Sequence, residues 1–237
     1  MIKNKTKNIK IQNLRMRKIY IRHADKQYKN MDAELFKHDP GIKSVGVEKS
    51  KKVAEKLVAE YGEPTRIISS PFRRARETAM VMNSVLKNPV EEIFIDRNIS
   101  EYLGNHPESE LDVTPATKIH NPPHPETIED MKKRVDRHVS KMYKYDHDDP
   151  KAVVWIVTHG IIMKHITASG GIRNAKNFPC LTCVSIIETP DMKKCEFLIF
   201  YDRPKSKTKP KQVVKKNYGD LLKKIVNPSV KRAPKKN

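Results

Sequence analysis

The chain has 237 residues, a length that suits one α/β domain with a substantial core. Its net charge of +20 is concentrated at the ends: residues 1–18 contribute +7 and residues 203–237 contribute +12, which leaves +1 for residues 19–202. No run of about 18 apolar residues occurs and the lysine-rich start lacks an apolar stretch, so we expect neither a membrane-spanning segment nor a secretory signal.

The first part of the chain predicts a basic arm followed by a strand, a helix, a strand and a helix. Residues 1–17 show no apolar periodicity and are predicted to form a basic flexible arm. A strand is expected at about 18–22. Apolar residues at helical spacing predict a helix from 44 to 61, which Gly62 and Pro64 end. A short central strand at 66–69 leads into a Ser-Pro turn, and a helix follows from 71 or 72 to about 86.

The second part alternates in the same way, around an irregular segment. Residues 102–126 are rich in Pro, His, Asn and Thr, and we expect them to form a rim or lid. Thr127 followed by Asp130 predicts a helix N-terminus. The other predicted elements are strands at 90–96, 152–159, 184–188 and 196–201 and a helix at 160–166. This alternation is typical of an α/β fold, and we predict a three-layer α-β-α sandwich around a mostly parallel sheet.

Residues 204–237 are predicted to be a basic tail that contains an amphipathic helix. Lysine and proline interleave at 205–211, whereas apolar residues recur at helical spacing between Val214 and Ile225 beside several lysines. Two explanations stay open for this helix: docking onto the catalytic body, or a role with a partner, a membrane surface or nucleic acid. The basic ends predict non-specific binding of nucleic acid or another polyanion.

Two apolar runs each end in a histidine, at Arg22-His23 and at Thr158-His159, and an arginine-rich turn containing Arg74 lies between them. Open α/β sheets place ligands at the carboxyl ends of their strands. Imidazoles and guanidinium groups at one sheet edge suit a phosphoryl group, because arginine forms paired hydrogen bonds with its oxygens and keeps its charge. The pattern therefore predicts an enzyme that handles phosphate. The alternative for Arg74 is a surface ion pair with Glu77.

Three segments resemble the signatures of the histidine phosphatase superfamily, which includes the phosphoglycerate mutases. They are Arg22-His23-Ala24, Ser70-Pro71-Phe72-Arg73-Arg74-Ala75-Arg76-Glu77-Thr78 and Thr158-His159-Gly160. The resemblance implies a phosphoglycerate mutase-like catalytic domain over residues 18–203.

The resemblance also implies roles for individual residues. His23 would be phosphorylated transiently, Arg22 and Arg74 would hold the phosphoryl oxygens, and His159 would complete the pocket. Glu101 resembles the family's proton donor, with Asp25 and Glu108 as alternatives. The third motif residue, usually Gly, is Ala24 here.

The expected activity is metal-independent hydrolysis of phosphomonoesters in a phosphorylated small molecule or phosphoprotein. The glycolytic mutases carry a Ser/Thr and a Trp-Asn pair after their nucleophile, and residues 25–30 lack that pair. A mutase-like phosphotransferase and a catalytically inert phospho-ligand-binding protein are the alternatives. No cofactor and no metal are expected, since the Cys180–Cys183 spacing has no second ligand pair. Three widely spread cysteines favour a reducing compartment, the cytoplasm, and the basic tail makes the nucleus an alternative.

Overall fold

The computed structural model describes residues 16–27, 39–104, 125–145, 152–169, 178–189 and 192–198. Six strands form one sheet in the order β3-β2-β4-β1-β5-β6. The strands are β1 (Arg17–Arg22), β2 (Arg66–Ser69), β3 (Ile93–Ile95), β4 (Val153–Thr158), β5 (Cys183–Thr189) and β6 (Met192–Leu198). The first four strands are parallel to one another, whereas β5 is antiparallel to β1 and β6 is antiparallel to β5.

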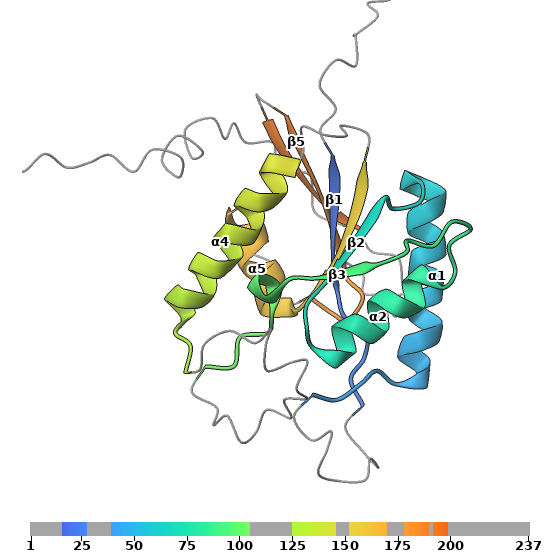
Figure 1. Ribbon diagram of the computed structural model, residues 1–237, viewed down its shortest axis with the longest axis horizontal. Helices are drawn as coiled ribbons and strands as arrows, with labels where there is room; N and C mark the ends of the chain where they lie inside the picture. The colour runs from blue at the N-terminus through green and yellow to red at the C-terminus, as the bar shows by residue number, and fades with distance from the viewer. Residues whose placement is uncertain are drawn as a thin grey trace, which may run out of the picture.

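Helices cover both faces of this sheet, so the predicted three-layer arrangement is confirmed (Figure 1). The helices are α1 (Ser44–Tyr61), α2 (Arg73–Asn83), α4 (Ile128–Tyr145) and α5 (Gly160–Ser169), with a short 3₁₀ helix η1 (Arg97–Ile99). In Figure 1, α1 and α2 lie on one side of the strands, and α4 and α5 lie on the other. Within the described ranges, no helix has the length and apolar character needed to cross a bilayer.

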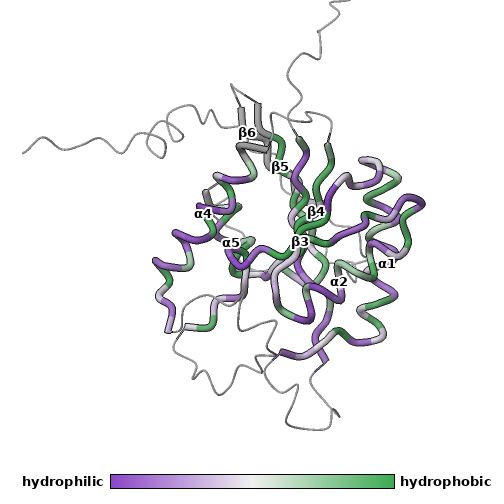
Figure 2. Tube along the Cα trace, in the orientation of Figure 1, coloured by the Kyte–Doolittle hydropathy of each residue, from purple (hydrophilic) through white to green (hydrophobic). Residues whose placement is uncertain are grey.

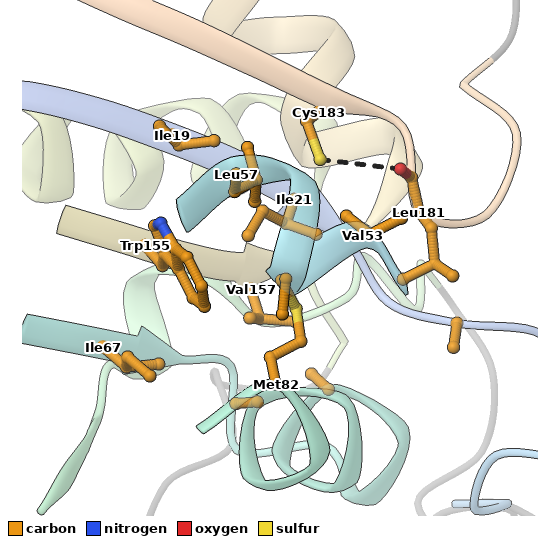
Figure 3. Packing of buried hydrophobic residues seen from close by; sticks show 14 of the residues in the cluster. Ile19, Ile21, Val53, Leu57, Ile67, Met82, Trp155, Val157, Leu181 and Cys183 are labelled. Carbon is orange, nitrogen blue, oxygen red and sulfur yellow. Dashed lines mark hydrogen bonds between the residues drawn. The ribbon is translucent and has the colours of Figure 1, made fainter. Parts of the chain in front are cut away.

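The two sides of the sheet have separate cores, because successive strand residues point to opposite faces. On the face covered by α1 and α2, which we call the α1/α2 face, Trp155 packs with Leu57 and Met82 (Figure 3). On the opposite α4/α5 face, Ile156 packs with residues of α4 and α5 such as Val135. Figure 2 shows β4 as mainly hydrophobic, whereas hydrophilic and hydrophobic residues alternate along α1 and α4.

Most element predictions agree with the structure, and the differences have local causes. Helix α2 ends at Asn83 instead of near 86, where the Asn83 side chain pairs with the main chain of Val90. Strand β3 is shorter than predicted, since it pairs only with the end of the four-residue β2. The body begins earlier than predicted, with Met16 buried and Arg17 in β1.

Three predicted segments lie wholly or largely outside the described residues. They are the basic arm at 1–17, most of the irregular segment at 102–126 and the basic tail at 204–237 with its amphipathic helix. The helix start at Thr127 is described and confirmed: its Oγ1 accepts a hydrogen bond from the Asp130 amide at 3.1 Å and donates to the Asp130 carboxylate at 2.7 Å.

Candidate active site

The site forms where β1, β2 and β4 end side by side. These strands are neighbours and parallel, so their carboxyl ends meet at one edge of the sheet. The His23 amide donates a hydrogen bond to the Thr158 carbonyl at 2.9 Å, and the Ser70 amide donates to the Val157 carbonyl at 2.9 Å. The rings of His23 and His159 lie with centroids 5.2 Å apart. The expected convergence of the two histidine-bearing strands is therefore present.

His23 is held with one ring nitrogen directed at the main chain. Its Nδ1 lies 2.7 Å from the Ala24 carbonyl oxygen, which can only accept, so Nδ1 carries the proton and Nε2 keeps a free lone pair. The side chain is only 1% exposed. Burial, together with the nearby His159 and Arg74, lowers the pKa of His23 from 6.5 to about 2. The imidazole is thus neutral near pH 7, as a nucleophile must be.

Ala24 stands where the family motif usually has glycine, and its methyl group packs against Gly46 of α1. A Cβ atom added to Gly46 would lie 3.2 Å from the Ala24 methyl carbon, tighter than normal packing. The absence of a side chain at Gly46 therefore makes room for that methyl group. The Ala24 amide donates to Thr78 Oγ1 at 3.0 Å, which ties this turn to α2.

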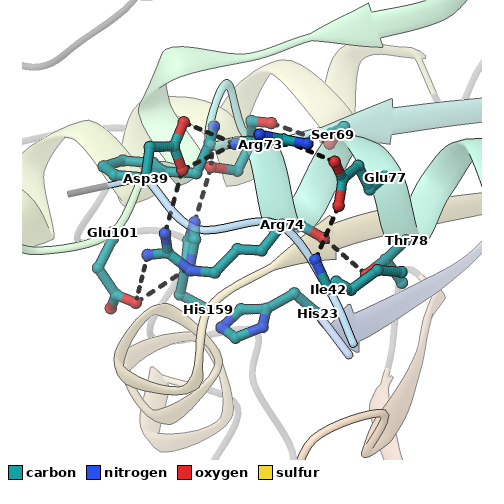
Figure 4. Close-up of polar contacts among 12 residues, drawn as sticks. His23, Asp39, Ile42, Ser69, Arg73, Arg74, Glu77, Thr78, Glu101 and His159 are labelled. Atoms are coloured by element: carbon teal, nitrogen blue, oxygen red, sulfur yellow. Dashed lines mark hydrogen bonds and ion pairs between the residues drawn. The ribbon is translucent and has the colours of Figure 1, made fainter. Parts of the chain in front are cut away.

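Arg74 is 3% exposed and lies between two carboxylates (Figure 4). Its Nη1 is 3.3 Å from Asp39 Oδ1, and its Nη2 is 3.2 Å from Glu101 Oε2. The guanidinium also lies 4.5 Å from the centre of the Phe72 ring. The alternative of a surface pair between Arg74 and Glu77 is wrong, because Glu77 instead accepts a hydrogen bond from Arg73 Nε at 2.6 Å.

The segment that precedes α1 is attached to the start of α2 by Asp39 and Glu77. Both carboxylate oxygens of Asp39 accept from the Arg73 amide, at 2.8 and 2.9 Å, and Glu77 Oε2 accepts from the Ile42 amide at 2.7 Å. Burial raises the pKa of Asp39, an effect that the neighbouring arginines oppose. A Cβ at Gly41 would lie 2.5 Å from the Glu77 carboxylate, so a larger residue there would displace that side chain.

The half-buried Glu101 and the fully buried His159 lie together beside Arg74. Glu101 Oε2 is 3.0 Å from His159 Nδ1, a contact that is an ion pair only when the imidazole is protonated. Burial raises the pKa of Glu101, but His159 and Arg74 outweigh burial and hold that pKa far below its usual range. Burial lowers the pKa of His159 to about 4. On its other nitrogen, His159 Nε2 lies 2.7 Å from Ser70 Oγ.

Arg22 and Asp25 flank His23 along the chain. The loop at 178–182 wraps around Arg22: the Leu181 amide donates to the Arg22 carbonyl at 3.1 Å, and Arg22 Nη1 donates to the Phe178 carbonyl. Asp25, an alternative proton donor, pairs with Lys49 at 3.0 Å. Glu108, the other alternative, lies outside the described residues. Glu101 is the candidate acid that the structure places against both Arg74 and His159.

Three side chains of this site could together contact a cation. His23, Glu101 and His159 each offer one ligand atom, and these atoms lie within 4.8 Å of one another. The guanidinium of Arg74 contacts the same Glu101 oxygen, so its charge opposes a cation and favours an anion there. The expectation that no metal takes part stays a prediction.

Several residues that build the site had no role in the sequence analysis. Ser70 and Thr78 lie inside the arginine-rich signature, so their positions were available there. Asp39 lies outside the three signature segments. Arg134 and Glu126 form a buried ion pair behind Glu101, and nothing in the sequence distinguishes them from exposed helix charges. Contacts between distant segments give these residues their importance.

Comparison with known proteins gives a superfamily for the chain and solved structures that share its fold. The sequence profile of the histidine phosphatase superfamily (branch 1) matches residues 19–198. Among solved structures, the mycobacterial glucosyl-3-phosphoglycerate phosphatase has a TM-score of 0.52 at 19% identity, over 72% of this chain and 89% of that chain. The protein histidine phosphatase SixA with bound tungstate has a TM-score of 0.50 at 16% identity, over 72% and 87%.

A further structure of the mycobacterial phosphatase, in complex with inorganic phosphate, has a TM-score of 0.53 at 16% identity, over 78% of this chain and 96% of that chain. At these identities the similarity shows the fold alone. No curated protein matches this sequence.

Proposed function

The chain belongs to the histidine phosphatase superfamily (branch 1), and on that premise we propose that it is a metal-independent phosphatase acting on phosphomonoesters through a phosphohistidine. The observation that carries the proposal is the state of His23. Its Nδ1 proton is engaged by the Ala24 carbonyl, and its pKa is lowered to about 2. Nε2 therefore offers a lone pair across the neutral pH range without an additional base.

In the first step, Nε2 of His23 attacks phosphorus and forms a P–N bond while the P–O bond to the leaving group breaks. Arg22, Arg74 and His159 supply the positive and hydrogen-bonding groups around the transferring oxygens. Arg74 suits this task because Phe72 and Asp39 hold it in one position before substrate arrives. Such preorganisation stabilises charge that develops in the transition state.

Glu101 supplies the proton that the leaving oxygen needs. Its carboxylate is ionised while Arg74 and His159 lie against it, and a bound phosphoryl group would alter both contacts. The phosphoryl oxygens compete for Arg74 and add negative charge nearby, which raises the pKa of Glu101 toward the range of a proton donor. Glu101 then protonates the departing oxygen and is left as a carboxylate.

In the second step, water attacks the phosphohistidine. The Glu101 carboxylate takes a proton from the attacking water, the P–N bond breaks, and the electron pair returns to Nε2 of His23. Inorganic phosphate is the product. Hydrolysis is proposed in preference to a mutase reaction because residues 25–30 lack the Trp-Asn pair of the glycolytic mutases. The comparisons by themselves support a phosphatase or phosphotransferase.

The test measures release of inorganic phosphate from an aryl phosphate in EDTA, together with trapping of an acid-labile phosphoenzyme. We expect His23→Ala to lower kcat/KM by at least about 10⁴-fold and to abolish the labelled intermediate, as removal of a covalent nucleophile does. His165→Ala is the matched control, because His165 lies on α5 and pairs with Asp136 at 2.9 Å, apart from the site residues.

Each alternative has its own outcome in this experiment. Labelled protein without phosphate release, with transfer to a second phosphorylated compound, would indicate a phosphotransferase. Phosphate binding with no label and no turnover would indicate an inert binding protein. Turnover that His23→Ala leaves unchanged contradicts the proposed mechanism.

We further propose that the basic ends attach the enzyme to polyanions such as nucleic acid in the cytoplasm or nucleus. Residues 1–18 and 203–237 together carry +19 of the +20 charge. Removing residues 1–15 and 204–237 should abolish salt-sensitive retention on heparin and leave kcat/KM for an aryl phosphate unchanged. Equal retention of the trimmed and full chains would refute this attachment.

A further inference from the structure

The short segment that carries Glu101 is held by side chains from other elements. Residues 98–101 have four consecutive main-chain carbonyls, and each accepts a hydrogen bond from a buried side chain. Thr158 Oγ1 donates to the Ile99 carbonyl at 2.7 Å. Arg134 donates to the other three: Nη1 to Asn98 and Ser100, both at 2.9 Å, and Nη2 to Glu101 at 3.2 Å.

Arg134 is itself locked by Glu126. Arg134 Nε and Nη2 donate to the two Glu126 oxygens at 2.5 and 2.9 Å, which is the paired geometry of a strong arginine–carboxylate contact. The two side chains are 3% and 4% exposed. With the three carbonyl contacts, all five N–H donors of the guanidinium are used. The Glu126 carboxylate balances the charge of the Arg134 guanidinium, and in this orientation every N–H donor of the guanidinium has an acceptor.

This arrangement determines where the Glu101 side chain begins. The segment begins within η1 and, in the described part of the chain, pairs with no strand, so these side-chain contacts fix its position together with burial of Ile99. The Glu101 carboxylate contacts Arg74 at 3.2 Å and His159 at 3.0 Å, distances that a small shift of the main chain would change. Misplacement of a catalytic group by about 1 Å can cost about 100-fold in rate.

We propose that Arg134, fixed by Glu126, is the positioning residue for the proton donor: it sets the main chain at 98–101 so that the Glu101 carboxylate meets the leaving oxygen. This inference rests on the proposed function and deepens it. It assigns Arg134 no contact with substrate. Its effect should therefore be confined to the part of the reaction that needs an acid.

The experiment compares two substrates that differ in their need for that acid. Phenolate is a poor leaving group, with a conjugate acid of pKa about 10 like that of tyrosine. Dinitrophenolate is far more stable and leaves without a proton. We measure kcat/KM for phenyl phosphate and for 2,4-dinitrophenyl phosphate, because kcat/KM reports the step in which the leaving group departs.

Arg134→Lys keeps the charge but has three donors without the planar fork, so it cannot hold Glu126 and three carbonyls together. We expect a loss of about 100-fold for phenyl phosphate and less than about threefold for 2,4-dinitrophenyl phosphate, within the range of general acid catalysis. Glu101→Gln should show the same selectivity. Adding Arg134→Lys to Glu101→Gln should cause no further loss for phenyl phosphate, because both changes remove one function.

Two further variants separate positioning from general damage. Glu126→Gln keeps the shape of the pair and removes the negative charge, and it should give the same substrate selectivity to a smaller extent. It replaces Arg134→Lys as the test if that variant folds poorly. Arg137→Lys changes an exposed arginine on the same helix and should alter neither substrate. Inhibition by inorganic phosphate should stay within about twofold in folded Arg134→Lys, Glu126→Gln and Arg137→Lys, since these variants keep Arg22, His23, Arg74 and Glu101.

Equal losses for both substrates, or a further loss when Arg134→Lys is added to Glu101→Gln, would overturn the positioning role while leaving the phosphohistidine mechanism intact. Failure of the wild-type chain to form a phosphoenzyme would overturn the proposed function, and this inference with it. The two failures are therefore distinguishable.

Discussion

The two faces of the sheet bury different kinds of side chain. The α1/α2 face buries an apolar cluster in which Trp155, Leu57 and Met82 interlock (Figure 3). The α4/α5 face also has an apolar cluster, but beside it lie the Arg134–Glu126 ion pair and a chain of hydrogen bonds from Tyr20 through His138 to Asp96. Both polar groups contact the stretch between β3 and Glu101.

Buried charges are costly to desolvate, and an apolar replacement of the same shape is often as stable. The polar groups of the α4/α5 face therefore need an explanation other than stability. Their position supplies one: the segment from Asp96 to Glu101 has little regular structure, and directional hydrogen bonds to it add to the packing of the buried Ile99. The comparison shows that one face is mainly apolar packing, whereas the other also holds the segment that carries Glu101, the proposed proton donor.

The largest stability effect is expected from the α1/α2 face. Leu57 is fully buried, so Leu57→Ala leaves a cavity and should lower the free energy of unfolding by about 3 kcal/mol. Urea unfolding measures this loss. Because the site contacts none of the lost atoms directly, kcat/KM of the folded enzyme should be unchanged.

Val45→Ala is the control for this change, since Val45 lies on the same helix and is exposed; it should cost less than about 0.5 kcal/mol. A fall in kcat/KM for Leu57→Ala that matches Arg134→Lys would show that the two faces do not divide their roles in this way.

A smaller contribution to the free energy of unfolding, one that depends on pH, is expected from Asp96 on the α4/α5 face. Burial raises the pKa of Asp96, but its hydrogen bond to His138 at 2.8 Å and that residue's charge outweigh burial, so the pKa falls from 3.8 to about 2. A lowered carboxyl pKa stabilises the native state above the unfolded pKa. That contribution is lost as pH falls from about 4 to about 2. Allowing for partial exposure of the carboxyl group, we expect it to be about 1–2 kcal/mol.

The measurement is the free energy of unfolding between pH 2 and pH 7, for the wild type and for Asp96→Asn. The variant should be less stable at pH 7 and should lose less stability in acid. Asp136→Asn is matched to it, because Asp136 also pairs with a histidine, His165, but is exposed. If the acid dependence of Asp96→Asn equals that of the wild type, the hydrogen bond of Asp96 does not stabilise this face.

The sequence predicted the site residues at the ends of strands better than it predicted Glu101. His23 and His159 directly follow β1 and β4, Arg22 ends β1, and Arg74 lies in the first turn of the helix after β2. Parallel strands bring their carboxyl ends together by geometry alone. Their convergence was therefore predictable. Glu101 was assigned by resemblance with two alternatives, because it lies in an irregular segment whose course the local residues do not determine.

Other parts were not predictable for the same physical reason. The contact between Ala24 and Gly46 joins two residues 22 positions apart, and the missing side chain at Gly46 leaves room for the methyl group that follows His23. Glu77 pairs with Arg73 and not with Arg74, and which pair forms depends on the side of α2 that contacts the segment before α1. Helical spacing allowed both pairs.

By itself, the sequence determined the order of strands and helices, the layered fold and the chemical groups delivered to one sheet edge, because apolar periodicity and strand ends are local properties. Only the tertiary structure decided the proton state of His23, the burial of Arg74 between Asp39 and Glu101, and the anchoring of residues 98–101 by Arg134. These depend on desolvation and on hydrogen bonds between distant segments, which exist only once the chain has folded.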